Sequence, residues 1–257
     1  MDHAGRALRQ DADQPHRTRD AATGRVAQPG PDATHRAARP VIPALHVVAF
    51  DFDGTLADTY PWFEAILGDV ARQFGFRTPD AAEKAALRQA DVRTILRTLG
   101  IPLWKAPRIL SHIRARMEAS APRIALFPDV SASLEALAAS GLRLAVVSSN
   151  SEANVRRILG ADTAGVFQHF ACGADIFGKP AKLERLLRRH RCAPQAAMLV
   201  GDELRDIHAA RKVGMRSGAV AWGYNDLSAL TRQGPDEVFL HPREWAERLV
   251  AGRQTRE

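Results

Sequence analysis

The chain has 257 residues, 46% of them hydrophobic and 25% charged, which is enough for one large domain or a domain with an insertion. It carries 36 Lys and Arg against 29 Asp and Glu, a formal charge of +7. That balance fits small phosphorylated substrates, nucleic acid or a simple richness in arginine, and it does not choose among them. No apolar run approaches the ~20 residues of a membrane span, and no signal-peptide core follows Met1, so we expect no membrane partner.

Residues 1–42 are rich in Arg, Ala, Asp, Pro and Gly. Up to position 40 the only large apolar side chains are those of Met1, Leu8 and Val26. Burying these few side chains cannot offset the conformational entropy that the segment would lose on becoming ordered. We therefore predict that residues 1–42 form a disordered tail.

The first predicted strand, at 46–50, is a short apolar run of the kind that is buried on both faces of a sheet. It is followed by Asp51-Phe52-Asp53-Gly54-Thr55, which places two carboxylates two residues apart just before a glycine turn. Ligands of open α/β sheets bind at the carboxyl ends of the strands. Two such close acids repel each other, so a cation or a shared proton must compensate them. The alternative is a purely structural turn in which the acids bind backbone amides.

Only helical patterns follow this strand, up to about position 128. Apolar residues recur at helical spacing over 62–70 and 92–99, and a longer basic helix is predicted over 104–119. Its arginines, Arg108, Arg114 and Arg116, are typical of a solvated face, although an arginine here could bind a substrate carboxylate. An all-helical block between two strands predicts an inserted domain at 58–127, within a core formed by 43–57 and 128–252.

Alternating strands and helices make up the rest of the chain. Strands are predicted at 142–148, 167–172, 196–201, 217–222 and 238–240, and helices at 131–139, 152–159, 180–190 and 204–213, with a last helix through Trp245 and Leu249. Such alternation implies parallel pairing through right-handed crossovers, hence an α/β fold with a doubly wound parallel sheet.

Polar residues follow three of these later segments. Ser148-Ser149-Asn150 ends one strand, Gly201-Asp202-Glu203 with Asp206 ends another, and Lys179 opens the helix between them. Taken singly, each fits a helix cap or a solvated side chain. A parallel sheet brings its strand ends to one edge, so together they predict a site with Asp51 and Asp53.

These motifs, in this order, resemble those of the haloacid dehalogenase-like hydrolase superfamily over roughly Val47 to the last strand. The first motif is matched by 51–55, the second by Ser148, the third by Lys179 and the fourth by Asp202 with Asp206. The resemblance implies a Rossmann-like core with an inserted helical C1 cap. The run Ala221-Trp222-Gly223-Tyr224 is similar to the phosphoglycolate phosphatase-like members, whereas Glu203 departs from the Ser often found after the Asp of the fourth motif.

The resemblance also implies roles for these residues. Asp51 would be the nucleophile that forms an aspartyl phosphate, and Asp53 the general acid and base. Ser148 and Lys179 would stabilise the phosphoryl group. Mg²⁺ would be held by the Asp51 carboxylate, the Asp53 carbonyl and Asp202, with Asp206 binding it directly or through water. Thr55, Ser149 and Asn150 are expected to bind substrate.

Asp53 favours phosphate monoesters, because related dehalogenases and phosphonoacetaldehyde hydrolases lack this second acid. We therefore expect a Mg²⁺-dependent phosphatase of small phosphorylated metabolites, acting as a monomer or homodimer. A phosphosugar mutase on the same core is the alternative enzyme. A non-enzymatic, basic nucleic-acid-binding protein is the other alternative, although no helix-turn-helix, zinc-finger or aromatic RNA-binding signature supports it. Cys172 and Cys192, in no CxxC arrangement, indicate reduced packing residues and a cytoplasmic protein, with a disulfide between them as the alternative.

Overall fold

The structure is a computed structural model that describes residues 43–173 and 178–254, with side chains up to position 250. The chain divides into two units, Met1–Pro40 and Val41–Glu257, and only the second contains described residues. The predicted disordered tail at 1–42 therefore lies outside the described residues. Within them, no helix combines the length and the apolar character needed to cross a bilayer.

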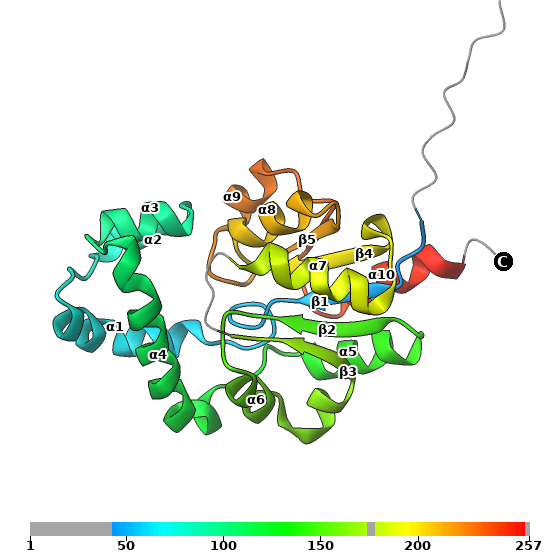
Figure 1. Cartoon of the computed structure of the whole chain (residues 1–257), viewed down its shortest axis with the longest axis horizontal. Coiled ribbons are helices and arrows are strands. Elements are labelled where there is room, and N and C mark those ends of the chain that lie inside the picture. Colours follow the sequence, from blue (N-terminus) through cyan, green and yellow to red (C-terminus); the bar gives the residue numbers. More distant parts are fainter. Residues whose placement is uncertain (1–42, 174–177, 255–257) are drawn as a thin grey trace, which may run out of the picture. The chain divides into compact units, whose positions relative to one another are not determined.

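The described residues form a six-stranded sheet in which all neighbouring strands run parallel, in the order β3-β2-β1-β4-β5-β6 (Figure 1). The strands are β1 (Val47–Phe50), β2 (Arg143–Val147), β3 (Phe167–Ala171), β4 (Ala197–Gly201), β5 (Arg216–Val220) and β6 (Glu237–Phe239). The predicted α/β fold with a doubly wound parallel sheet is thus confirmed.

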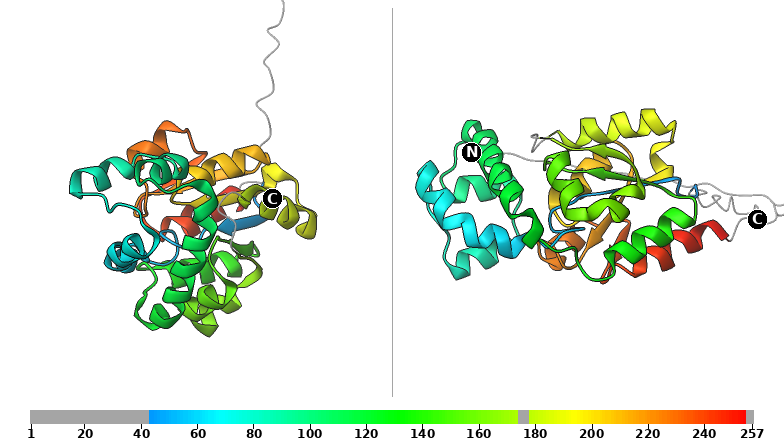
Figure 2. Two further views of the ribbon diagram at one scale, coloured as in Figure 1. Left: turned by 60° about the vertical axis from the view of Figure 1, so that its left-hand side comes forward. Right: turned by 90° about the horizontal axis from the view of Figure 1, so that it is seen from below.

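Helices cover both faces of this sheet. They are α5 (Val130–Ala139), α6 (Glu152–Gly165), α7 (Lys179–His190), α8 (Leu204–Lys212), α9 (Leu227–Arg232) and α10 (Glu244–Gln254). Phe50 belongs to the buried cluster that contains Leu134 of α5 and Trp245 of α10, whereas the adjacent Ala49 belongs to the cluster that contains Leu183 of α7. Successive side chains of a strand point to opposite faces, which separates these two clusters. Figure 2 shows α7 on one side of the sheet and α5 with α10 on the other.

A helical block lies between β1 and α5, beyond the carboxyl ends of the strands (Figure 1). It consists of α1 (Tyr60–Phe74), α2 (Ala81–Leu87), α3 (Val92–Thr98) and α4 (Ala106–Ser120), with short 3₁₀ turns at Leu103–Lys105 and Ala121–Arg123. The block has a small core of its own, formed by Ile66, Val70, Leu99, Ile101 and Ile109. These side chains bury one another, so the helices of the block pack around an apolar centre distinct from the two clusters on the sheet.

The elements of the sequence analysis recur with ends that shift by a few residues, and larger differences occur at three places. The helix predicted at 152–159 continues as α6 to Gly165, across a non-helical residue, Gly160, whose φ is 74°. The short helices α2 and α9 were not predicted individually. Both contain alanine and polar residues with few large apolar side chains, so their periodicity is weak. Their ends are fixed instead by contacts such as the capping box of Asp80 and Glu83 at the start of α2.

Candidate active site

The three central strands bring the predicted residues to one edge of the sheet. β1 pairs with β2 on one side and with β4 on the other. Asp51 follows β1, Ser148 follows β2 and Asp202 follows β4, while Lys179 opens α7. The expected convergence of strand ends is therefore present in the structure.

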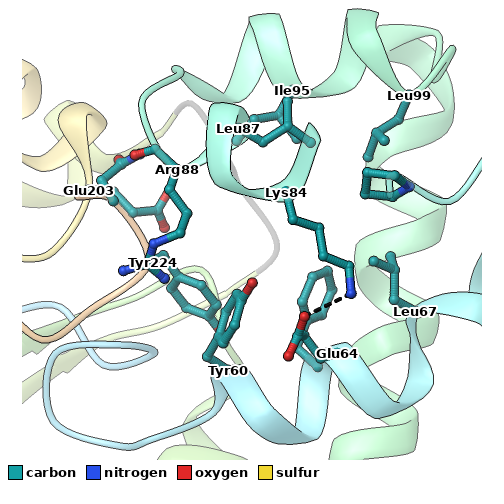
Figure 3. Close-up of a pocket in the computed structure, with 13 residues that line it drawn as sticks. Tyr60, Glu64, Leu67, Lys84, Leu87, Arg88, Ile95, Leu99, Glu203 and Tyr224 are labelled. Carbon is teal, nitrogen blue, oxygen red and sulfur yellow. Dashed lines mark hydrogen bonds and ion pairs between the residues drawn. The ribbon is translucent and has the colours of Figure 1, made fainter. Parts of the chain in front are cut away.

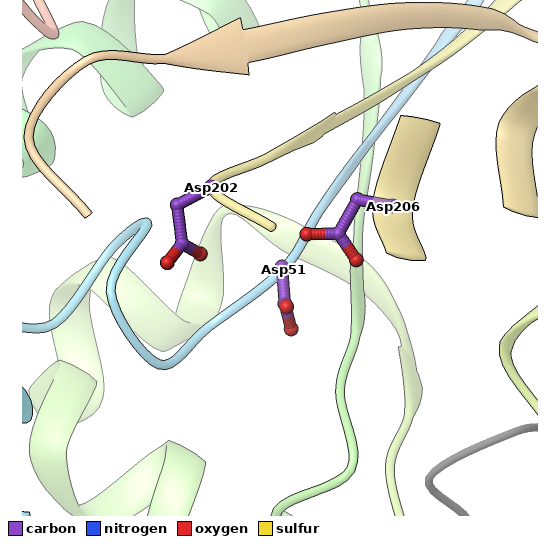
Figure 4. Close-up of side chains that lie close together, drawn as sticks. All are labelled: Asp51, Asp202 and Asp206. Carbon is purple, nitrogen blue, oxygen red and sulfur yellow. The ribbon is translucent and has the colours of Figure 1, made fainter. Parts of the chain in front are cut away.

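Three buried acids face one another at this edge: Asp51, Asp202 and Asp206 (Figure 4). One carboxylate oxygen from each lies within 4.8 Å of the others. Buried charges of one sign are stable only when paired or bound to a cation. Three carboxylate oxygens from rigid strand and helix ends form the donor set that a hard divalent cation such as Mg²⁺ prefers, so the residues fit this metal.

Asp202 is held in place by residues from two other segments. Its Oδ1 accepts a hydrogen bond from Thr55 Oγ1 at 2.7 Å, and its Oδ2 accepts one from the Tyr224 amide at 2.8 Å. A Cβ on Gly223 would overlap the Asp202 side chain, so only glycine allows this approach. The Trp222 indole also donates to the Thr55 carbonyl at 3.1 Å. The run 222–224, noted above only by resemblance, thus positions Asp202.

Burial and neighbouring charges shift the pKa values of the three acids. Burial raises the pKa of Asp202 well above its ordinary value, and the charges of Glu203, Asp51 and Asp206 add to this shift. Burial also raises the pKa of Asp206 to about 6, although Lys179 opposes the shift. For Asp51, burial acts in the same direction, but Lys179 and Arg205 outweigh it and lower its pKa. Asp51 is consequently the acid of this cluster whose ionised form is favoured most strongly.

Lys179 supplies the positive charge beside Asp51. Its buried ammonium lies 2.7 Å from Asp51 Oδ2 and also forms an ion pair with Asp206 Oδ1. Burial alone would lower the pKa of Lys179, but the charges of Asp206 and Asp51 raise it above its ordinary value. Lys179 is therefore a permanent cation where negative charge of a phosphoryl group would accumulate.

Asp53 has the properties of a general acid. Burial and the Asp51 charge raise the pKa of Asp53 to about 7. Both of its oxygens accept from Asn150 Nδ2 at 3.2 Å, which orients the carboxyl group. An acid that titrates near neutral pH can both give and take a proton under physiological conditions.

The three residues predicted to bind substrate have different surroundings. Thr55 donates to Asp202, and Asn150 donates to Asp53. Ser149 is buried beside Ser148, whose Oγ accepts from the Asn150 amide at 3.0 Å and so retains its own proton for donation. Substrate binding by these three residues stays a prediction.

Two cations that the sequence analysis did not assign to the site reach it in the structure. Arg205 Nη2 lies 4.0 Å from Asp51 Oδ2 and donates to Glu203 Oε1 at 2.5 Å. Lys182 Nζ donates to the Ser148 carbonyl at 2.7 Å. Each lies one helical turn or less from a motif residue, Asp206 or Lys179, which is the sequence signal that could have indicated them.

The helical block contacts the core beside this site. Arg88, at the end of α2, donates from Nε to Asp226 Oδ1 at 2.8 Å and from Nη2 to the Gly223 carbonyl at 3.0 Å. A largely apolar pocket lies next to these contacts, with Tyr60 and Lys84 on the block and Tyr224 on the core (Figure 3). Both parts of the chain therefore line this pocket, which includes Tyr224, the residue whose amide binds Asp202.

Comparisons with known proteins agree with this arrangement. The family model described as haloacid dehalogenase-like hydrolase matches residues 48–220. The phosphoglycolate phosphatase of Synechococcus elongatus is 36% identical over 201 residues, covering 78% of this chain and 95% of that protein. The phosphoglycolate phosphatase of Shigella boydii is 32% identical over 222 residues, covering 75% and 87%. The crystal structure of a predicted phosphatase from Clostridium acetobutylicum has a TM-score of 0.69 at 17% identity, covers 81% of this chain and 100% of that one, and shows the shared fold.

The family match spans the strands and site segments from β1 to β5, and the relatives are matched over most of their length. The predicted resemblance is therefore confirmed. The chain belongs to the haloacid dehalogenase-like hydrolases, and its relatives identify it as a phosphatase.

Proposed function

We propose that this phosphatase hydrolyses phosphate monoesters of small metabolites through an aspartyl phosphate on Asp51, in a Mg²⁺-dependent reaction. The observation that carries the proposal is the pairing of an ionised Asp51 with Asp53, whose pKa is raised to about 7 by burial and by the Asp51 charge. One carboxylate is suited to attack and the other to proton transfer, and their surroundings set these roles apart.

The first half-reaction transfers the phosphoryl group to the enzyme. A carboxylate oxygen of Asp51 attacks phosphorus, and the bond from phosphorus to the substrate oxygen breaks. Asp53 donates its proton to that oxygen, which leaves as an alcohol. Ser148 donates a hydrogen bond to a phosphoryl oxygen, and the Lys179 ammonium, already 2.7 Å from Asp51 Oδ2, balances the negative charge.

The second half-reaction regenerates the enzyme. Asp53, now ionised, takes a proton from a water molecule whose oxygen attacks phosphorus. The bond between phosphorus and Asp51 breaks, inorganic phosphate leaves, and Asp53 is protonated again. Asn150 holds the Asp53 carboxyl group in one orientation for both transfers.

The metal would be held by Asp51, Asp202, Asp206 and the Asp53 carbonyl. When bound, Mg²⁺ supplies positive charge that offsets the repulsion among the acids and polarises the phosphoryl group. Thr55 and the Tyr224 amide fix the orientation of Asp202 for this purpose.

We further propose that residues 58–127 are a cap domain on a core formed by 43–57 and 128–252. Two observations support this division. The helical block has its own buried core, and Arg88 joins it to the core through the polar contacts with Asp226 and Gly223. A cap over the acids would exclude water from the aspartyl phosphate until the alcohol has left.

The substrate is best represented by phosphoglycolate, the compound named for both relatives above. The free thiols of Cys172 and Cys192 support a cytoplasmic enzyme. We expect it to act as a monomer or homodimer.

A phosphate-release screen tests the proposal. The full-length protein is incubated with a panel of phosphorylated metabolites, with and without Mg²⁺, and inorganic phosphate is measured. Mg²⁺-dependent release from small monoesters is expected. Isomerisation of hexose phosphates without phosphate release would indicate the mutase instead, and inactivity together with steeply salt-dependent binding of DNA or RNA would indicate a nucleic-acid-binding protein.

A further inference from the structure

Arg114 is a partly buried arginine on α4 that the proposed reaction does not use. Its Nε and Nη2 atoms are buried, and neither has a hydrogen-bond partner among the described residues. Burying unpaired guanidinium N–H groups costs free energy, and arginines are rarely left in that state. These donors are therefore available to a ligand.

The surroundings of Arg114 place it at the active site. Its carbonyl oxygen accepts from Asn154 Nδ2 at 3.1 Å, and Met117, one turn further along α4, contacts Asn150 Nδ2 at 3.0 Å through its sulfur. The same Asn150 nitrogen donates to Asp53. α4 is thus linked to the proton donor, Asp53, through Asn150.

The charge of Arg114 interacts with the Asp53 carboxylate. Burial lowers the pKa of Arg114, and the nearby Asp53 carboxylate opposes this shift. Asp53 faces the oxygen that leaves with the alcohol in the proposed reaction. A cation close to Asp53 on the helical block therefore faces the part of the substrate beyond that oxygen.

We propose that the Arg114 guanidinium binds a carboxylate carried by the substrate on the carbon next to its phosphorylated oxygen, which makes Arg114 a specificity-determining residue. This inference rests on the proposed phosphatase function and names the class of its substrates, the short phosphorylated carboxylic acids. In such a compound a single carbon separates the leaving oxygen from the carboxylate. The two parallel N–H groups of a guanidinium match the two oxygens of a carboxylate, and the pairing would satisfy the donors that the protein leaves unpaired.

The neighbouring arginines of α4 are not equivalent to Arg114. Arg108 is exposed, and Arg116 donates from Nη2 to Asp69 Oδ2 at 3.3 Å on the outer surface of the block. Arg116 therefore provides a matched control, since it has the same side chain on the same helix but a partner of its own.

The test compares two substrates that differ only in the distal group, phosphoglycolate and ethyl phosphate. Arg114→Gln should lower kcat/KM for phosphoglycolate by about 10- to 100-fold more than for ethyl phosphate, because it removes a charged hydrogen-bond donor that only the first substrate engages. Arg114→Lys should restore part of the preference, since it keeps the charge but not the paired donors. Arg116→Gln should leave the ratio of the two kcat/KM values unchanged.

The melting temperature separates this role from a structural one. Arg114→Gln should melt at or above the wild-type temperature, because it removes buried, unpaired donors. An equal loss of activity on both substrates, or a clearly lower melting temperature, would show that Arg114 supports the fold and would overturn the proposal. A wild-type enzyme that hydrolyses both substrates equally well, or that hydrolyses other members of the metabolite panel but neither of these two, would overturn the Arg114 inference alone. One that releases phosphate from no member of the panel would contradict the proposed function itself.

Discussion

Glu203 and Arg205 form an ion pair at the rim of the acid cluster, with Arg205 Nη2 donating to Glu203 Oε1 at 2.5 Å. Glu203 occupies the position where the resemblance leads one to expect Ser, and its charge contributes to the raised pKa of Asp202 after burial itself. Arg205 compensates this added acid and lies 4.0 Å from Asp51 Oδ2. The acid added at this position is therefore paired with a neighbouring cation that offsets its charge.

This pairing predicts strong coupling between the two residues. Arg205→Gln should lower both kcat/KM and the melting temperature, because it leaves Glu203 beside three other acids without its ion-pair partner. Glu203→Gln with Arg205→Gln should recover part of both losses. A double-mutant cycle on the free energy of unfolding should give an interaction of about 1–3 kcal/mol. Additive effects of the two substitutions would contradict this account.

Removing one metal ligand should separate metal binding from folding. Asp202→Asn can keep the contacts with Thr55 and the Tyr224 amide, since the Thr55 hydroxyl can also accept. The metal-free variant should melt no lower than metal-free wild type, because burial already disfavours the Asp202 charge, as its raised pKa shows. Mg²⁺ at about a hundredfold excess over its Kd should stabilise the wild type by about 2.7 kcal/mol and the variant far less.

The control for this experiment is Asp162→Asn, which changes an exposed acid on α6 and should keep the full Mg²⁺ effect. Thermal unfolding with and without Mg²⁺, after treatment with a chelator, measures both variants. A normal Mg²⁺ shift in Asp202→Asn would exclude Asp202 as a ligand.

Substitutions of the two acids of the first motif, Asp51 and Asp53, should impair phosphate release in different ways. Asp51→Asn should abolish phosphate release while the far-ultraviolet circular dichroism spectrum stays that of wild type. Asp53→Asn should be slowed about 10²- to 10⁴-fold on alkyl phosphates, whose leaving oxygen needs a proton. With p-nitrophenyl phosphate, which leaves without protonation, Asp53→Asn should release a burst of about one nitrophenolate per enzyme and then turn over slowly. Substantial turnover by Asp51→Asn would refute the aspartyl phosphate.

Gly223→Ala should impair catalysis although it replaces no residue that acts in the reaction. The added methyl would overlap the Asp202 side chain, so Asp202 must shift. A displacement of about 1 Å in a catalytic constellation costs up to about 10²-fold in rate. Gly165→Ala, at the end of α6, where a Cβ meets nothing within 4 Å, is the matched control and should retain wild-type kcat/KM. Equal activity of the two variants would show that Asp202 does not need its present position.

The sequence was most informative where chemistry is local. The acids of the first motif are adjacent to an apolar run, and the parallel sheet follows from alternating patterns, so both could be predicted. The hydrogen bonds that orient the side chains of the site could not be predicted from the sequence. Thr55 and Asp202 lie 147 residues apart, and Asn150 and Asp53 lie 97 apart, so their hydrogen bonds depend on strand order and side-chain rotamers. The same holds for Lys182 and the Ser148 carbonyl, which are 34 residues apart in the sequence.

Because β1 lies at the centre of the sheet, loss of activity in denaturant can report on the unfolding of the sheet. Both neighbours of β1 carry site residues, and the acids come from points between 51 and 206 in the chain. The constellation is complete only when strands distant in sequence have paired on both sides of β1. Loss of phosphate release in denaturant should therefore coincide with cooperative unfolding of the whole sheet, which makes catalysis a sensitive assay for refolding.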